Sequence, residues 1–179
     1  MADLPRQYAW LRAEPGPRLL KEMLALYGAI ETPGKADNPL ILSWAKSIGL
    51  GSVYKHDSTA WCGLAMAYAA AQAGWEHAPR GNALWAQNWA SWGNPVDAPM
   101  LGDVLVFTRR GGGHVGLYVG EDKACFHVIG GNQGDAVSIK RIARGRLFAS
   151  RRCPWRVNQP ANVRRIIMSS SGPISDNEA

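Results

Sequence analysis

Two side chains in this sequence have the types and positions needed for nucleophilic catalysis, Cys62 and His114. Cys62 falls in the first turn of an expected buried helix, where free backbone amides and the positive end of the helix dipole stabilise a thiolate. The same amides can hold the oxyanion of a tetrahedral intermediate. His114 opens an expected strand directly after three glycines, and imidazole is the common base for a thiol nucleophile. A free cysteine is as often a small buried hydrophobic residue, so position alone leaves both interpretations open.

The helices that must position Cys62 are predicted from the spacing of apolar residues. Residues 18–30 and 39–49 have helical spacing, and Asn38 and Pro39 introduce the second of these segments. Residues 61–73 are apolar on nearly every side and rich in alanine, which predicts a central buried helix that packs closely against a sheet. Residues 75–99 form a connector with three tryptophans at one-turn spacing, which is compatible with a helix.

The strands that must position His114 follow the helices in the chain. Residues 103–108, 114–120, 124–129 and 136–142 are predicted to form an antiparallel meander, and the whole sheet is expected to have about four to six strands. Alternation places His114 on one face of its strand and Val115 on the other, where the apolar residues pack inward. Helices first and a meander afterwards indicate the α+β class.

One domain is expected from the length of 179 residues. Residues 1–17 are rich in proline and are predicted to be an irregular lead-in. Residues 18–156 form the predicted catalytic domain. Residues 157–179 lose periodicity and are predicted to be a flexible tail. No internal repeat is visible.

Composition narrows the choice of partners without identifying one. The net charge is +6, which would attract a polyanion such as nucleic acid, an anionic membrane or an anionic cell wall. Eight tryptophans exceed ordinary core needs and suit a groove that holds flat ligands. Three cysteines without a Cys-x-x-Cys spacing argue against a disulfide framework or a zinc knuckle. The N-terminus has no apolar run typical of a Sec signal peptide, and no segment is long enough to span a membrane.

Four segments together resemble the CHAP/NlpC superfamily of papain-like peptidoglycan hydrolases, within which a phage- and prophage-associated endolysin branch is most similar. They are residues 57–65, 102–107, 114–120 and 130–133, and the resemblance covers roughly residues 20–155. It implies a papain-like domain whose central helix packs on an antiparallel sheet. It also implies a cysteine nucleophile, a histidine base and a polar third residue that together hydrolyse amide bonds of wall peptides, as an amidase or endopeptidase, through an acyl-enzyme. No cofactor and no metal are expected.

The third catalytic residue has two candidates. Asn132 lies in a Gly-Gly-Asn-Gln run that resembles this branch, and we favour it as the group that fixes the tautomer of His114. His127 lies near the spacing at which NlpC-like members place a third polar group, and it is equally compatible with a partly buried strand residue. Gln133 could line the site, although a turn residue is the simpler interpretation.

Four residues before the nucleophile complete the candidate site. Asp57 could cap the helix entry or brace the nucleophile loop, and capping is the simpler reading. Trp61 adjoins Cys62 and could line the site. Tyr54 and His56 are within range to donate to the oxyanion, but their spacing departs from the family pattern, so that role stays open.

The expected partners are peptidoglycan stem peptides, with anionic wall components attracted to the basic surface. We expect a monomer, no nucleic-acid partner, and synthesis in the cytoplasm followed by action at the cell wall after release through a holin, lysis or injection. Two alternatives remain, a non-catalytic wall-binding module and a papain-fold acyltransferase that uses the same pair. A metal site at Cys125 and His127 is disfavoured because no second pair of ligands completes it.

Overall fold

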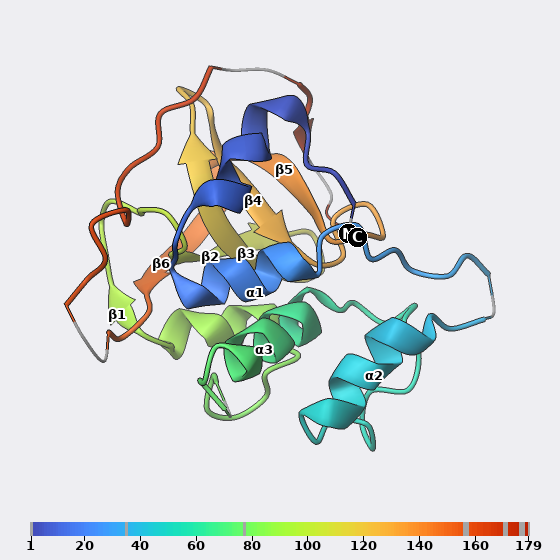
Figure 1. Cartoon of the computed structure of the whole chain (residues 1–179). Helices are drawn as coiled ribbons and strands as arrows, with labels where there is room; N and C mark the ends of the chain where they lie inside the picture. Colours follow the sequence, from blue (N-terminus) through green and yellow to red (C-terminus); the bar gives the residue numbers. More distant parts are fainter. Residues whose placement is uncertain are drawn as a thin grey trace.

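A mixed sheet of seven strands forms the centre of this computed structural model, which describes residues 2–34, 36–76, 78–155, 158–169, 172–175 and 178. The strand order is β1-β6-β2-β3-β4-β5-β7, and every neighbouring pair is antiparallel except the parallel pair β5 and β7 (Figure 1). In chain order the strands are β1 (Asn94–Pro95), β2 (Val104–Arg109), β3 (Gly112–Glu121), β4 (Cys125–Gly130), β5 (Ser138–Ala143), β6 (Leu147–Arg152) and β7 (Ile174–Ser175).

The α+β class predicted from the sequence is present, and the four predicted strands correspond to the consecutive strands β2 to β5. The expected number of four to six strands is too low, because β1, β6 and β7 add to the sheet. β1 and β7 have two residues each, too few for a periodic pattern. β6 lies between β1 and β2 and ends in two arginines, so its sequence lacks the alternation of a half-buried strand.

The helices precede most of the sheet in the chain, and α1 and α3 lie on the same face of it (Figure 1). Their bounds are η1 (Arg6–Ala13, a 3-10 helix), α1 (Arg18–Ala25), α2 (Pro39–Ser47), α3 (Cys62–Gln72), η2 (Ala86–Ser91) and η3 (Arg144–Arg146), the last two also 3-10 helices. The lead-in therefore contains a helical element that the sequence did not predict. α1 ends before residue 30 because Gly28, with φ 88°, turns the chain and donates to the Val137 carbonyl at 3.0 Å.

The first face of the sheet carries the main hydrophobic core. Valines of β2 and β3 pack there with Ile129 of β4 against α1 and α3. α3 has eight buried residues, as a helix that is apolar all round requires. A Cβ added to Gly131 would lie 2.6 Å from the Ala65 side chain, so this glycine lets the chain after β4 approach α3 closely. The core thereby holds the start of α3 against the ends of β3 and β4.

The opposite face carries a second, aromatic core. Phe107, Tyr118 and Phe126 pack there with three aliphatic residues of β2, β4 and β5. Part of the C-terminal segment, predicted to be a flexible tail, lies against the edge of this sheet, since β7 pairs with β5 and Gly172 accepts a hydrogen bond from Arg141. In the described residues, no helix has the length and apolar character needed to cross a membrane.

Candidate active site

Cys62 is the first residue of α3, and its thiol is buried with 4% of the residue exposed. Burial raises the pKa of the thiol. The Val115 backbone amide and the positive charge of Arg109 act in the opposite direction, as does the Gly63 amide. The sulfur thus lies among backbone donors at a helix N-terminus, and it borders the first residues of β3. These donors would stabilise a thiolate once one forms.

Gly63, the residue after the thiol, allows another segment to cover the helix start. A Cβ at Gly63 would lie 2.4 Å from the Leu84 carbonyl oxygen and 2.6 Å from the Ala83 carbonyl oxygen. No side chain fits such a space, so the 83–84 backbone can lie against the first turn of α3 only because residue 63 is glycine.

His114 lies in β3, where it pairs with Phe107 of β2 and stacks on its ring at a centroid distance of 6.4 Å. The residue is only 1% exposed, and burial lowers the pKa of its imidazole to about 4. Its Nε2 contacts Gln133 Oε1 at 3.0 Å. The Gln133 amide nitrogen donates to the Val128 and Ser138 carbonyls, so the amide oxygen faces the ring. Nε2 therefore carries the hydrogen, and Nδ1 keeps the lone pair that a base requires.

Cys62 and His114 both border the start of β3 but from opposite faces of the sheet, since Cys62 belongs to the helix-side core and the His114 ring stacks on Phe107 of the second core. The thiol borders the Val115 amide, which belongs to the same peptide group as the His114 carbonyl. Arg109, at the end of β2, influences both groups electrostatically. The structure has no hydrogen bond between Cys62 and His114. With the thiol pKa raised and the imidazole pKa lowered, the resting pair is a neutral thiol and a neutral imidazole.

Of the candidates for the third residue, Gln133 makes the hydrogen bond to His114. Asn132, the residue favoured from the sequence, is buried beside it in the left-handed region at φ 57°, and no hydrogen bond joins it to His114. Gln133 is 1% exposed and accepts a hydrogen bond from the Ser138 hydroxyl through its backbone oxygen. The residue expected to be a turn residue or a lining residue is thus the one that orients the imidazole.

His127 belongs to a different network on the helix-covered face of the sheet. Its Nδ1 contacts Tyr8 Oη at 2.7 Å, and its Nε2 contacts Asp122 Oδ2 at 2.8 Å. Arg141 Nε donates to the same carboxylate oxygen at 2.8 Å and, as the largest influence, holds the pKa of Asp122 well below its usual range. His127 and Ile129 share a face, whereas His114 and Tyr118 share the other. His127 therefore joins η1 to β4 and β5, away from His114.

The four residues predicted before the nucleophile have structural partners. Asp57 is 1% exposed and accepts hydrogen bonds from the backbone amides of Thr32 and Asn38, at 3.0 and 2.8 Å. Its carboxylate therefore ties the loop before α3 to the start of α2 and does not cap α3. The N-cap residue of α3 is Trp61, whose side chain makes no capping hydrogen bond. Trp61 is fully buried and donates from Nε1 to a Glu31 carboxylate oxygen.

The hydroxyl of Tyr54 donates to the Thr59 carbonyl at 2.9 Å, and burial raises the pKa of this phenol. His56 is largely exposed and contacts Asp37 Oδ2 at 3.1 Å. Neither side chain hydrogen-bonds to Cys62 or His114. The oxyanion donors suggested by geometry are therefore backbone amides at the start of α3.

The Gly-Asp pair in the resembled motif also has a structural role. Asp103 is 1% exposed and accepts two hydrogen bonds from Arg152 of β6, at 3.0 and 2.8 Å, and one from the Met100 amide. A Cβ on Gly102, whose φ is 84°, would lie 2.2 Å from the Pro17 ring. Asp103 thus joins β2 to β6, and Gly102 allows Pro17 to pack against the start of β2.

Three charged residues near His114 were not identified from the sequence. Arg109, Arg146 and Glu178 all influence the pKa of the imidazole. The two arginines gave a signal, since the C-terminal half is rich in basic residues, but Glu178 gave none because it lies 64 positions after His114.

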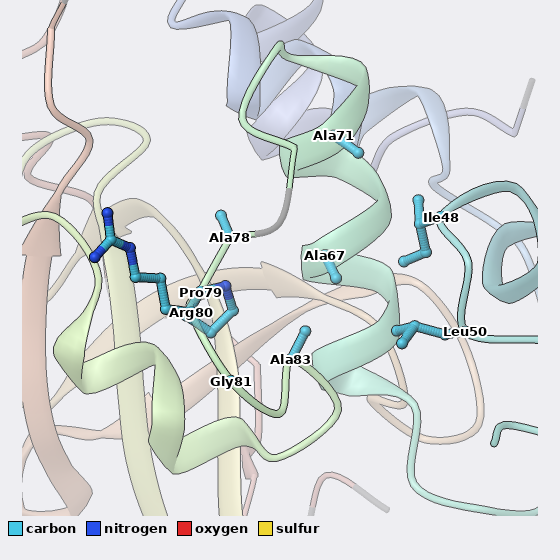
Figure 2. Close-up of a pocket in the computed structure, with 9 residues that line it drawn as sticks. All are labelled: Ile48, Leu50, Ala67, Ala71, Ala78, Pro79, Arg80, Gly81 and Ala83. Atoms are coloured by element: carbon cyan, nitrogen blue, oxygen red, sulfur yellow. The ribbon is translucent and has the colours of Figure 1, made fainter.

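One well-formed hollow lies beside α3, away from the Cys62 and His114 side chains. It has a volume of about 300 Å³ and runs between the 78–83 segment, the end of α2 and the Ala67–Ala71 stripe of α3 (Figure 2). Figure 2 shows the Arg80 side chain directed away from that stripe. Its full lining is Ile48, Leu50, Ala67, Ala71, Ala78, Pro79, Arg80, Gly81 and Ala83. Neither Cys62 nor His114 lines it.

Tryptophans mainly fill the interior. Trp44, Trp61 and Trp89 are buried, whereas Trp85 is 56% exposed. Trp92 makes edge contacts with the Trp75 and Trp89 rings. The high tryptophan count is thus largely explained by packing around α3 and η2.

In the part of the chain that the structure describes, no three histidine, cysteine or acidic side chains form a group that could hold a metal ion. Cys62, Cys125 and Cys153 are all free and buried. His127 cannot serve as a ligand without releasing Tyr8 or Asp122, because both ring nitrogens are engaged. No protein-family model matches this chain, and no curated protein matches it either.

Proposed function

We propose that this protein is a papain-like cysteine hydrolase that cleaves amide bonds in the peptide part of bacterial peptidoglycan, as an amidase or endopeptidase. The observation that carries the proposal is the placement of the Cys62 thiol at the N-terminus of α3, beside the start of the strand that holds His114. The hydrogen bond from His114 Nε2 to Gln133 supports it further, because it leaves Nδ1 as the basic nitrogen.

The proposed reaction has two steps. In the first, the His114 ring moves from the Phe107 face of the sheet to the thiol, and Nδ1 takes the proton of Cys62 as the sulfur attacks the substrate carbonyl carbon. The backbone amides at the start of α3 stabilise the oxyanion. The imidazolium then protonates the leaving amine, the C–N bond breaks and a thioester remains. In the second, His114 takes a proton from water, the resulting hydroxide attacks the thioester, and the carboxylic acid and free thiol are released.

Peptidoglycan as the substrate rests on the resemblance of residues 57–65, 102–107, 114–120 and 130–133 to papain-like wall hydrolases. The net charge of +6 supports this choice, because bacterial walls carry anionic polymers. Release to the wall through a holin, by lysis or by injection is part of the same proposal.

The test uses purified sacculi, the wild-type protein and the variant Cys62→Ala. Wild type should lower turbidity and release new amino groups, and the variant should lose at least about 10³-fold in rate, as removal of a covalent nucleophile generally does. Cys153→Ala is the matched control, since it removes another buried thiol outside the site. Mass spectrometry of the released fragments identifies the bond that is cut.

Three outcomes would contradict the proposal. Full cleavage by Cys62→Ala would exclude the thiol as nucleophile. Tight binding to sacculi without cleavage by the wild type would favour a wall-binding module. Transfer of the acyl group to an added amine, with no free acid formed, would favour an acyltransferase built on the same pair.

A further inference from the structure

The C-terminal Glu178 is buried beside the candidate active site. Its residue is 0% exposed, and both carboxylate oxygens accept hydrogen bonds from Arg146, Oε1 from Nη1 at 2.8 Å and Oε2 from Nη2 at 2.6 Å. This is the two-pronged geometry by which a guanidinium recognises a carboxylate. The carboxylate thus occupies a binding position made by a residue 32 positions earlier in the chain.

The Arg146 side chain has two backbone partners besides the Glu178 carboxylate. Its Nε donates to the Thr108 carbonyl at 3.0 Å, and its Nη1 also donates to the Ser175 carbonyl at 3.1 Å. Because the backbone of β2 holds the guanidinium in place, a carboxylate that replaced Glu178 would meet a preorganised donor pair. Preorganisation lowers the entropic cost of binding.

The sheet register places this donor pair near His114. Phe107 of β2 pairs with His114 on one side and with Leu147, the residue after Arg146, on the other. His114 and Leu147 are therefore two strand spacings apart, about 10 Å. Burial lowers the pKa of His114, and the Glu178 charge is the strongest influence that opposes this. The carboxylate and the imidazole thus share one buried environment.

We propose that Arg146 forms a subsite for the free carboxylate of an acidic wall peptide, and that Glu178 fills this subsite in the resting protein. Peptidoglycan stem peptides carry free carboxylates close to their amide bonds, so the ligand class fits the donor pair. The inference rests on the proposed function and gives it a specificity determinant and an internal competitor. Substrate would have to displace Glu178, which lowers the apparent affinity by the fraction of molecules in which the subsite is open.

A second glutamate–arginine pair lies elsewhere in the fold and is more exposed. Glu14 pairs with Arg164, whose side chain is 49% exposed, at 3.0 Å. That pair joins the N-terminal segment to residues 162–164 and contacts no residue of the candidate site. It provides a matched control, since Glu14→Gln removes one carboxylate from an arginine pair as Glu178→Gln does.

The experiment measures binding without turnover, by calorimetry on the full chain with Cys62→Ala. The probes are a stem tripeptide with a free α-carboxylate on its D-glutamyl residue and the same peptide with that group amidated. Glu178→Gln should tighten binding of the acidic peptide about tenfold and leave the amidated peptide unchanged, because it removes a competitor held at roughly millimolar effective concentration. Glu14→Gln should change neither affinity, and adding Arg146→Gln to Glu178→Gln should abolish the gain.

A structural role for Glu178 predicts a different pattern. If the ion pair serves stability alone, Glu178→Gln will lower the midpoint of thermal unfolding without a selective gain for the acidic peptide, and the proposal is then overturned. Equal gains for both peptides would overturn it as well. The proposed function fails separately, since that failure is cleavage of sacculi by Cys62→Ala, whereas this experiment requires no cleavage.

Discussion

Acid should destabilise this fold through His114, and the size of the effect follows from the burial of its ring. The pKa of the imidazole falls from 6.5 to about 4 because burial penalises the charged form. The stabilisation that comes from the neutral ring is complete above about pH 6.5 and is lost as the pH falls to about 4, because the unfolded chain binds the proton at the higher pH. At about 1.4 kcal/mol for each tenfold change in proton affinity, the interval corresponds to about 3 kcal/mol.

The assay is urea unfolding of the wild type and His114→Asn, each at about pH 7 and about pH 4. Asparagine does not titrate, and its shorter side chain does not reach Gln133 Oε1. Between the two pH values the wild type should lose about 3 kcal/mol more unfolding free energy than the variant. Other titrating groups, among them His127, whose pKa burial also lowers, are present in both proteins and cancel in the comparison.

Parallel loss of stability in the two proteins would refute the reasoning, because it would mean that His114 titrates alike in the folded and unfolded chains. The difference between the pH slopes is the measured quantity, so a constant loss of stability from the smaller asparagine side chain does not affect it. His56→Asn removes an exposed imidazole and measures what the loss of one histidine does by itself.

Three further substitutions test a hydrogen bond of the site, a buried ion pair and a close packing contact. Gln133→Leu should slow cleavage at least tenfold and cost about 1–3 kcal/mol in urea unfolding, because His114 loses its orienting partner and buried carbonyls lose a donor; unchanged kcat would argue against the role. Asp122→Asn should cost about 3–5 kcal/mol at neutral pH by leaving the buried Arg141 charge unpaired, against almost no change for a surface aspartate exchanged in the same way. Gly131→Ala should cost about 1–3 kcal/mol in thermal unfolding, since its Cβ would lie 2.6 Å from a side chain of α3, and a neutral result would show that the loop can move.

The sequence predicted the elements whose periodicity comes from burial on one side or on all sides. In β3, Val115, Leu117 and Val119 alternate with other residues, β4 is buried along its whole length, and α3 is apolar throughout, so their patterns follow directly from their packing. β6 was not predicted because its partners on both sides are strands that are distant in the chain. Its place is set by pairings such as Val104 with Arg151, and alternation within the segment carries little of that information.

The candidate site, like the fold, was predictable from the sequence only in part. Cys62 and His114 were identified because each stands at a recognisable boundary, a helix start and a strand start after glycines. The orienting residue was not, because Asn132 and Gln133 lie beyond the end of β4, where strand alternation no longer applies. Asn132 has a left-handed conformation and the Gln133 side chain reaches the imidazole from the next position, and two neighbouring amide residues give no signal of either in a sequence.

Burial and the proposed catalysis make opposite demands on this site. A nucleophilic thiolate needs donors and an accepting base, whereas burial raises the pKa of Cys62 and lowers that of His114. The resting pair therefore holds its proton on sulfur, and transfer to nitrogen requires compensation for the charges that it creates. Backbone amides at the start of α3 and the Arg109 charge supply that compensation for the sulfur, and the carboxylate bound to Arg146 supplies it for the imidazolium. An acidic substrate that replaced Glu178 would return a negative charge to that position, so the group that is recognised would also stabilise the charged form of the base. In the proposed reaction, charge recognition and proton transfer would thereby be linked through a single guanidinium.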